Sequence, residues 1–343
     1  MSKENRNGSV RGVGRRQFLK GAGMAAAATF AAGSFSTRAF AAAQEVKFAH
    51  IFNDSQPFHK WVLWASDQIL EKTQGRYKIS VFPSSSLGGE VEIYQGLTLG
   101  TIDMGFTGSP TASRAYGPMA LISGPYMFRD FDHWAAYRDS DMRKQVTAEF
   151  NTRSNLNVVG TVYYGLRHVT SNKKIAEPDD MKGLKLRVPN VPLYLLFPRS
   201  VGANPTPIAF SEVYLALQQG VVDGQENPLP TIFAQKFYEV QKHIALTGHM
   251  IDTLVAMTSS SLWSQLSDED KQIFSQVFDE AMAKCTDEVR ATEMSLINDF
   301  KTKYNVSVDE VDREAFRKKM IPELTGENVP WSKSDYEKVQ LIT

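Results

Sequence analysis

Residues 183–189 read Gly-Leu-Lys-Leu-Arg-Val-Pro, and this stretch decides how the rest of the chain is interpreted. Its leucines and valine alternate with Lys185 and Arg187, which predicts a strand with one buried and one polar face. Pro189 ends the strand, because proline lacks the backbone N–H that a ladder needs. Arg187 therefore falls near the carboxyl end of a strand, where open α/β sheets bind their ligands.

The side chain of Arg187 suits the recognition of an anion. A guanidinium stays charged and presents a planar fork that matches a carboxylate with two parallel hydrogen bonds. The strand pattern taken alone favours a plainer interpretation, an arginine on a solvated strand face. Further sequence evidence is needed to choose between the two.

Residues 217–228 form a second informative stretch, Leu-Gln-Gln-Gly-Val-Val-Asp-Gly-Gln-Glu-Asn-Pro. A helix is expected over 211–219, with Ser211 as its N-cap. Val221-Val222 then predicts a short strand, which an Asp-Gly turn follows. Asn227 precedes a proline and is held extended, so the stretch predicts a loop at a strand end.

The sequence around these stretches alternates between strand and helix patterns, which predicts an α/β fold with largely parallel sheets. One helix, expected over 267–305, is unusually long and should lie across two domains. Ser267 and Asp270 resemble a capping box at its start. The other helices are expected from Pro57 to the stop at Gly75, and over 90–99, 130–153 and 193–200. Strands are expected at 45–49, 77–82, 102–106, 158–164, 184–188, 244–246 and 253–257.

The charge of the chain is the average of two unlike segments. Its 343 residues contain 38 basic and 38 acidic residues, but residues 1–41 hold seven basic residues and one acidic residue. The remaining 302 residues therefore carry 31 basic and 37 acidic residues, a net charge of −6. This charge and the lack of a basic run argue against a nucleic-acid partner. The single cysteine, Cys285, excludes an internal disulfide and a multi-cysteine metal site.

Residues 1–41 have the three parts of a secretory signal. The run Arg15-Arg16-x-Phe18-Leu19-Lys20 resembles a twin-arginine export signal, and a weakly apolar, alanine-rich segment follows it. Small residues precede a cleavage site after Ala41, or alternatively after Ala43. We therefore expect a periplasmic mature protein that is not embedded in the membrane.

The usual signatures of catalysis and of metal binding are missing. None of the six histidines pairs at the i, i+4 spacing of a helical metal site, and the sequence has no Gly-x-Ser-x-Gly elbow or phosphate loop. We therefore expect neither an enzyme nor a bound cofactor or metal. A periplasmic enzyme that is exported folded with its cofactor remains an alternative, since twin-arginine substrates often carry one.

Together, residues 183–189 and 217–228 resemble the substrate-binding subunit of the tripartite ATP-independent periplasmic (TRAP) transporters, of DctP type. The resemblance covers nearly all of residues 45–320. It implies a Venus-flytrap fold, with two α/β lobes joined by hinge strands, crossed by a long helix, and closing on a ligand. The implied lobes are 45–164 with about 251–290, and 165–250 with about 291–320, followed by a C-terminal segment, 321–343.

The resemblance also implies a role without chemistry. The protein would capture a small organic anion and deliver it to a membrane permease of one small and one large subunit, and we expect it to be a monomer. The anion would be a carboxylate, such as a C4-dicarboxylate or a sugar acid. A sulfonate ligand is an alternative, as is a sensor kinase or a different permease as the partner.

Eight residues match ligand contacts of the family. Arg187 matches the arginine that forks onto the carboxylate, and Arg167 matches a second arginine often used for the same anion. Asn227 matches an amide that bonds the anion, Phe210 an aromatic wall, and Glu90 an acidic contact of the first lobe. The other three lie at the carboxyl end of the first strand: His50, Asn53 and Asp54.

Overall fold

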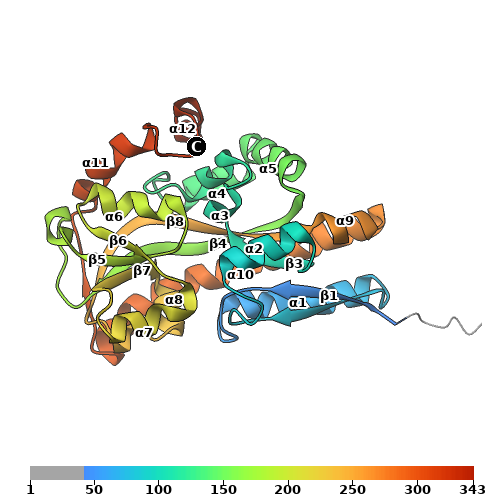
Figure 1. The fold of residues 1–343 in the computed structure, drawn as a ribbon, viewed down its shortest axis with the longest axis horizontal. Coiled ribbons are helices and arrows are strands. Elements are labelled where there is room, and N and C mark those ends of the chain that lie inside the picture. Colours follow the sequence, from blue (N-terminus) through green and yellow to red (C-terminus); the bar gives the residue numbers. More distant parts are fainter. Residues whose placement is uncertain (1–41) are drawn as a thin grey trace, which may run out of the picture. The chain divides into compact units, whose positions relative to one another are not determined.

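A nine-stranded sheet organises residues 42–343, the part of the chain that the computed structural model describes (Figure 1). The export signal expected over 1–41, with its cleavage end at Ala41, lies outside the described residues. Within residues 42–343, no helix has both the length and the apolar character needed to cross a bilayer.

The strands run in the order β2-β1-β3-β8-β4-β7-β5-β6, and β9 pairs with β8 outside this path. At one edge β1 is parallel to β2 and β3, and at the other β5 is parallel to β6 and β7. In the middle, the long strands β4 and β8 are antiparallel and connect the two parallel edges. The bounds are β1 (Gln44–Ala49), β2 (Tyr77–Phe82), β3 (Met104–Gly108), β4 (Leu156–Ser171), β5 (Lys185–Val188), β6 (Asn204–Pro207), β7 (Gly224–Pro228), β8 (His243–Ser259) and β9 (Ser307–Asp309).

The α/β class is confirmed, and the main correction concerns the centre of the sheet. The strands predicted at 244–246 and 253–257 are one continuous strand, β8, and the strand predicted at 158–164 extends to both sides as β4. Almost every residue of β8 is buried, on both faces of the sheet. A strand buried on both faces lacks the alternation that marks a half-exposed strand in a sequence.

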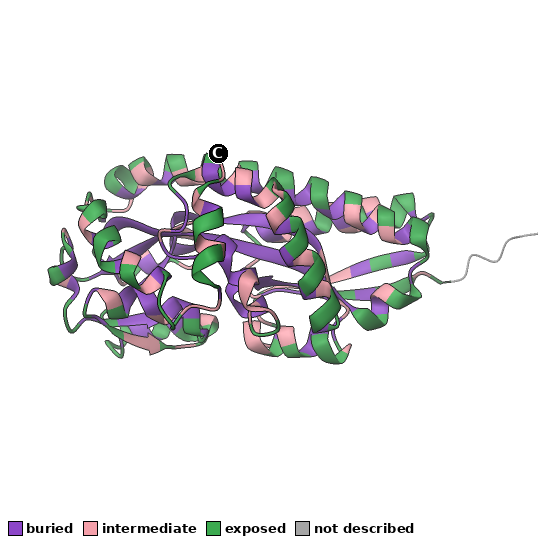
Figure 2. Ribbon diagram, turned by 90° about the horizontal axis from the view of Figure 1, so that it is seen from above, coloured by how far each residue is buried: buried purple, intermediate pink, exposed green. Residues whose placement is uncertain are grey.

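The helices cover the faces of the sheet, and Figure 2 shows their exposed outer sides above the buried strands. The α-helices are α1 (Pro57–Lys72), α2 (Glu90–Leu99), α3 (Ser109–Ala112), α4 (Phe131–Asp139), α5 (Asp141–Ser154), α6 (Leu196–Ser200), α7 (Val213–Gln218), α8 (Leu229–Ala234), α9 (Ser260–Gln265), α10 (Asp268–Lys303), α11 (Arg313–Leu324) and α12 (Lys333–Gln340). The 3₁₀ helices are η1 (Gly117–Ser123), η2 (Pro178–Met181), η3 (Pro192–Leu195), η4 (Phe210–Glu212) and η5 (Phe237–Glu239).

The long helix α10 was predicted correctly, including its N-cap. The Ser267 hydroxyl accepts a hydrogen bond from the backbone N–H of Asp270 at 3.1 Å. The Asp270 carboxylate accepts from the Ser267 hydroxyl and from Arg76, rather than from the Ser267 backbone N–H of a full capping box. The helix packs on α1 and β4 and, further along, on α8 and β9.

Several local predictions are wrong. Asn227, expected in a loop at a strand end, lies within β7, and the helix expected over 193–200 begins as η3. The helix expected over 130–153 is two helices, α4 and α5, because Ser140 is extended and caps the second one. The helix expected from Ser211 begins as η4 and continues as α7, so Ser211 is not an N-cap. Val221-Val222 is not a strand: β7 starts at Gly224, after Asp223 has paired with the backbone of Lys185.

Candidate ligand-binding site

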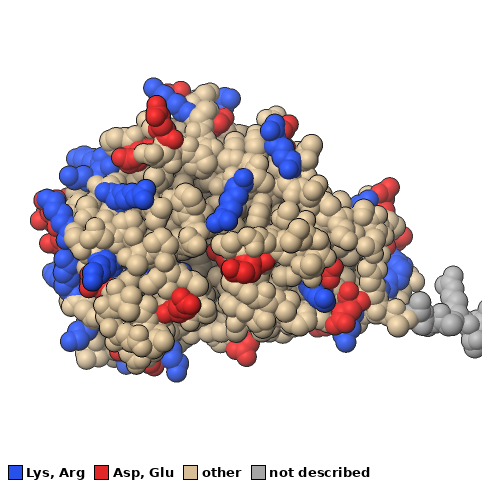
Figure 3. Space-filling view, in the orientation of Figure 1, with Lys and Arg blue, Asp and Glu red and all other residues tan. Residues whose placement is uncertain are grey.

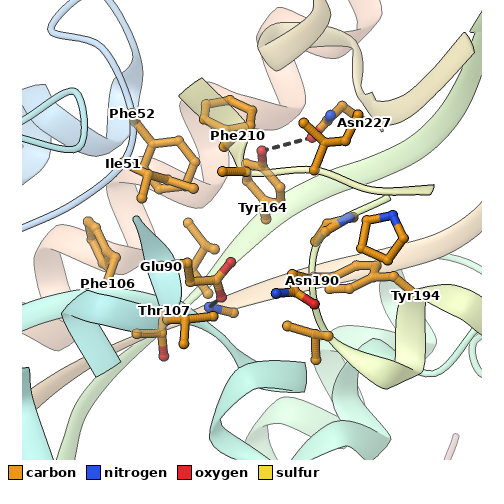
Figure 4. A pocket seen from close by; sticks show the side chains of 18 of the residues that line it. Ile51, Phe52, Glu90, Phe106, Thr107, Tyr164, Asn190, Tyr194, Phe210 and Asn227 are labelled. Atoms are coloured by element: carbon orange, nitrogen blue, oxygen red, sulfur yellow. Dashed lines mark hydrogen bonds between the residues drawn. The ribbon is translucent and has the colours of Figure 1, made fainter. Parts of the chain in front are cut away.

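A cavity of about 180 Å³ lies where β3, β4, β5 and β7 bring their side chains together (Figure 4). The pairing of β5 with β7 and of β7 with β4 places Arg187, Asn227 and Arg167 on neighbouring strands. Five of the eight predicted contacts line the cavity: Glu90, Arg167, Arg187, Phe210 and Asn227.

Arg187 enters this cavity with part of its guanidinium unpaired. The side chain is only 2% exposed, and its Nε and Nη2 atoms both donate to the carbonyl oxygen of Ile208, at 3.0 and 2.7 Å. Within residues 42–343 its Nη1 atom has no hydrogen-bond partner. Burial lowers the pKa of Arg187 to about 10, and the nearby charge of Arg167 adds to that shift. The protein therefore holds a cation in the cavity, and both N–H groups of its Nη1 atom still need an acceptor.

Arg167, by contrast, uses four of its five N–H donors on protein acceptors, three of them carboxylate oxygens. Its Nε and Nη2 atoms form a bidentate pair with Glu226, at 2.5 and 2.7 Å, and Nη2 also donates to the Glu226 carbonyl at 2.7 Å. Its Nη1 atom donates to Asp252 at 2.8 Å. Burial alone would lower the pKa of Arg167, but Glu226 and Asp252 outweigh it and raise that pKa well above its ordinary value.

The partners of Arg167 are themselves held from several sides. Burial acts to raise the pKa of Glu226, but the charge of Arg167 and hydrogen bonds from His249 and Arg167 lower it to about 2. His249 lies 3.1 Å from the Glu226 carboxylate and stacks on Phe197, with ring centroids 4.0 Å apart. Asp252 also accepts a hydrogen bond from the Tyr194 hydroxyl at 2.9 Å.

Aromatic rings form much of the remaining wall. Tyr164 donates to the side-chain oxygen of Asn227 at 3.2 Å and accepts from Thr231 at 3.1 Å. The amide nitrogen of Asn227 donates to Gln225 at 2.6 Å. The rings of Phe52, Phe106, Tyr194 and Phe210 line the same cavity.

The opposite side of the cavity carries acceptors and a hydroxyl. Glu90, at the start of α2, accepts hydrogen bonds at one carboxylate oxygen from the Gly108 backbone N–H at 2.7 Å and from Thr111 at 2.6 Å. Gly108 has little room for a side chain, since an added Cβ would lie 3.0 Å from that oxygen. The buried hydroxyl of Thr107, on β3, has no hydrogen-bond partner within residues 42–343.

The other three predicted contacts do not line the cavity. His50 is fully buried, lies 3.1 Å from His59, and has its pKa lowered to about 3 by burial and by that second imidazole. Asn53 donates to the carbonyl of Ala234 at 3.0 Å, so its amide is engaged by the protein. Asp54 is exposed.

Sequence reasoning missed several lining residues, above all Thr107, Tyr164, Asn190 and Tyr194. Asn190 could have been found, because it lies two residues after the strand of Arg187. The others carry no local signal, since each reaches the cavity through strand pairing or through bonds to distant residues. Residues 42–343 contain no cluster of three or more His, Cys, Asp or Glu side chains arranged to hold a metal ion.

Known proteins match this chain in sequence and in fold. The family described as DctP: Bacterial extracellular solute-binding protein, family 7, matches residues 48–327. The sialic acid-binding periplasmic protein SiaP of Vibrio cholerae is 39% identical over 264 residues, which cover 75% of this chain and 80% of that relative.

Two solved structures of TRAP periplasmic solute-binding proteins extend the match to the fold. The Polaromonas protein, bound to D-erythronate, superimposes with a TM-score of 0.83 and is 31% identical, covering 88% of this chain and 99% of that one. The Sulfurospirillum deleyianum protein, with bound succinate, superimposes with a TM-score of 0.80 and is 28% identical. The match covers 87% of this chain and 99% of that one.

Proposed function

The chain belongs to the bacterial extracellular solute-binding protein family 7 (DctP), the periplasmic binding proteins of TRAP transporters, and from this premise we propose that it captures a small hydroxylated organic acid. The family consists of binding proteins rather than enzymes, which removes the alternative of a cofactor-bearing enzyme. TRAP permease subunits are the partners that the family implies.

The observation that carries the proposal is the unpaired Nη1 atom of Arg187. A buried cation with an unsatisfied donor is costly, and a ligand carboxylate would supply both the missing acceptor and the missing charge. The net charge of −6 after residues 1–41 cannot attract an anion. Figure 3 shows acidic and basic side chains interspersed over one face, so the attraction would be local to the cavity.

Glu90 supports hydroxyl groups, rather than a second carboxylate, at the other end of the ligand. Like charges at close range repel each other, whereas a hydroxyl can donate to a carboxylate oxygen. Thr107 offers a further hydroxyl that has no protein partner within the described residues. Relatives bind ligands of both kinds: sialic acid and D-erythronate carry hydroxyl groups, and succinate is a dicarboxylate. Glu90 therefore favours the sugar acids over the C4-dicarboxylates.

Capture would occur by closure of two lobes, 45–164 with about 251–290 and 165–250 with about 291–320. An empty closed state would leave Arg187 without a counter-charge, so the ligand would stabilise that state and shift the hinge equilibrium towards it. The closed protein would then deliver the acid to the membrane permease.

The experiment is a thermal-unfolding screen of the purified protein, because a ligand that binds the folded state raises the unfolding midpoint. Each sugar acid is matched with its uncharged polyol, and a C4-dicarboxylate and small sulfonates are included. We expect one or more hydroxy acids to raise the midpoint and their polyols to have no effect. A response to sulfonates alone would favour the alternative ligand class, and a response to polyols and acids alike would contradict the proposal.

Glu90→Gln tests the hydroxyl end of the site. We expect the preference for a hydroxy acid over a dicarboxylate to shrink, because the amide no longer repels a second carboxylate. Isothermal calorimetry with both ligands measures the ratio of the two affinities. An unchanged ratio would remove Glu90 from the specificity argument while leaving the anion proposal intact.

A further inference from the structure

Three arginines are buried within residues 42–343, and they differ in what their guanidinium groups contact. Arg167 pairs with two carboxylates, and Arg187 lines the ligand cavity. Arg143, in the first turn of α5, is 3% exposed and does neither. It resembles Arg187 in being a buried cation with unsatisfied donors.

The guanidinium of Arg143 has no counter-charge in the described part of the chain. Its Nη1 atom donates to the sulfur of Met119 at 3.4 Å, while Nε and Nη2 have no hydrogen-bond partner. Burial lowers the pKa of Arg143, and of its neighbours only Tyr137 opposes that shift. Because arginine does not lose its proton in a protein, a full positive charge stays buried here.

The side chains nearby cannot balance that charge. The hydroxyl of Tyr137 is buried and interacts only weakly with Arg143, which lowers its pKa. Burial outweighs that effect and raises the pKa to about 12, so the hydroxyl remains neutral. Of the two closest acidic residues in sequence, Asp139 pairs with Arg138 at 2.7 Å and Asp141 pairs with Lys144 at 2.9 Å.

A groove of about 600 Å³ runs past Arg143, between α5, β4 and α10. Its lining includes the cations Arg138 and Lys144, two acids, Asp139 and Asp279, and neutral polar side chains of α5. Burial raises the pKa of Asp279, and the charge of Arg138 counteracts that shift. Arg138 also pairs with Asp139, so both acids of the groove interact with Arg138. Arg143 is the cation in this lining that no acidic side chain of the described chain neutralises.

We propose that Arg143 and Tyr137 form a second, small-anion site, separate from the ligand cavity. The unpaired Nε and Nη2 atoms and the phenol hydroxyl are donors, so the site suits a monovalent anion of halide size. A buried water could accept these hydrogen bonds, but it could not neutralise the guanidinium. The bound anion is a structural counter-ion for α4 and α5, and it takes no part in solute capture.

Bromide is the probe, because it scatters X-rays anomalously and resembles chloride in size. Crystals of the protein grown in sodium bromide should show an anomalous peak in contact with Arg143. An anomalous map with no peak near Arg143 would overturn the proposal, whatever the variants do.

A solution experiment separates this site from the ligand cavity. In an Arg187→Met background, sodium bromide should raise the unfolding midpoint by on the order of 2–4 °C over a bulky buffer anion at equal ionic strength. Adding Arg143→Met, which keeps the volume and removes the charge, should abolish that rise. An equal rise with and without Arg143 would contradict the proposal. If Arg143→Met does not fold, Arg143→Lys takes its place, and the same rise with lysine would count against a site built on the guanidinium.

Discussion

Arg167 and Arg187 are buried to the same depth on strands that both border β7, yet their guanidinium groups meet different surroundings. Arg167 donates to two carboxylates and a carbonyl, whereas Arg187 donates twice to one carbonyl, and its Nη1 atom has no partner among the described residues. The pKa of Arg167 is raised and that of Arg187 is lowered. The first arginine is balanced by the fold, and we infer that the second is balanced by the ligand.

This difference separates stability from affinity. Removing a paired buried charge destabilises the fold, because its partners are left as buried charges without a counter-charge. Removing an unpaired buried charge should instead weaken ligand binding. The sequence resemblance places both arginines on the anion. From its contacts we infer that Arg167 positions Glu226 and Asp252, while its contact with the anion stays a prediction.

Removing Arg167 should have the largest effect on the folded state. Arg167→Met leaves Glu226 and Asp252 buried without their cation, and we expect the free energy of unfolding to fall by about 3–5 kcal/mol. Urea denaturation measures it. Adding Glu226→Gln should recover part of the loss, since one stranded charge is gone. A loss below about 1 kcal/mol for Arg167→Met is the range of exposed ion pairs. It would contradict the conclusion that Arg167, unlike Arg187, stabilises the fold.

The second-largest effect should come from low pH, which protonates Glu226 and weakens its ion pair with Arg167. The pKa of Glu226 is about 2 when folded, below its ordinary value of 4.5, so its stabilising contribution is complete above pH 4.5 and is lost as the pH falls towards 2. This contribution is on the order of 3 kcal/mol. Unfolding measured between pH 6 and 2 should show a weaker pH dependence for Glu226→Gln. An equal dependence of unfolding on pH in the original protein and in Glu226→Gln would contradict the lowered pKa of Glu226.

The smallest effect should come from Thr107 in the cavity. Thr107→Val replaces a buried hydroxyl, which has no partner in the part of the chain described, with a methyl group. The stability of the ligand-free protein should therefore be unchanged or slightly higher. Affinity for a hydroxy acid should fall by about 1 kcal/mol, or roughly fivefold, if the ligand uses this hydroxyl. Calorimetry on both proteins provides the comparison, and equal affinities would place the ligand elsewhere in the cavity.

The sequence predicted best what depends on local pattern. The partly exposed strands β1 and β2 were recognised from their sequence pattern, and the N-cap of α10, Ser267, directly precedes its helix. The central strand β8 is buried on both faces and was predicted only as two fragments.

Some residues of the candidate site could also be predicted from the sequence, and others could not. Arg187 and Asn227 were located through the family resemblance, and their places towards the ends of β5 and β7 agree with it, since strand ends bind ligands in α/β sheets. The pairing of Arg167 with Glu226 and Asp252 could not be foreseen, because these partners are 59 and 85 residues away in the chain. Thr107 and Tyr194 enter the cavity through contacts of the same long-range kind.

The most direct test of the account is calorimetric titration of Arg187→Met with the best ligand of the screen, alongside its urea denaturation. We expect affinity to fall by about 2–5 kcal/mol, from roughly thirtyfold to several-thousandfold. The free energy of unfolding without ligand should stay the same or rise, because an unpaired buried charge has been removed. Unchanged affinity together with a large loss of stability would show that Arg187, like Arg167, serves the fold, and would contradict the account.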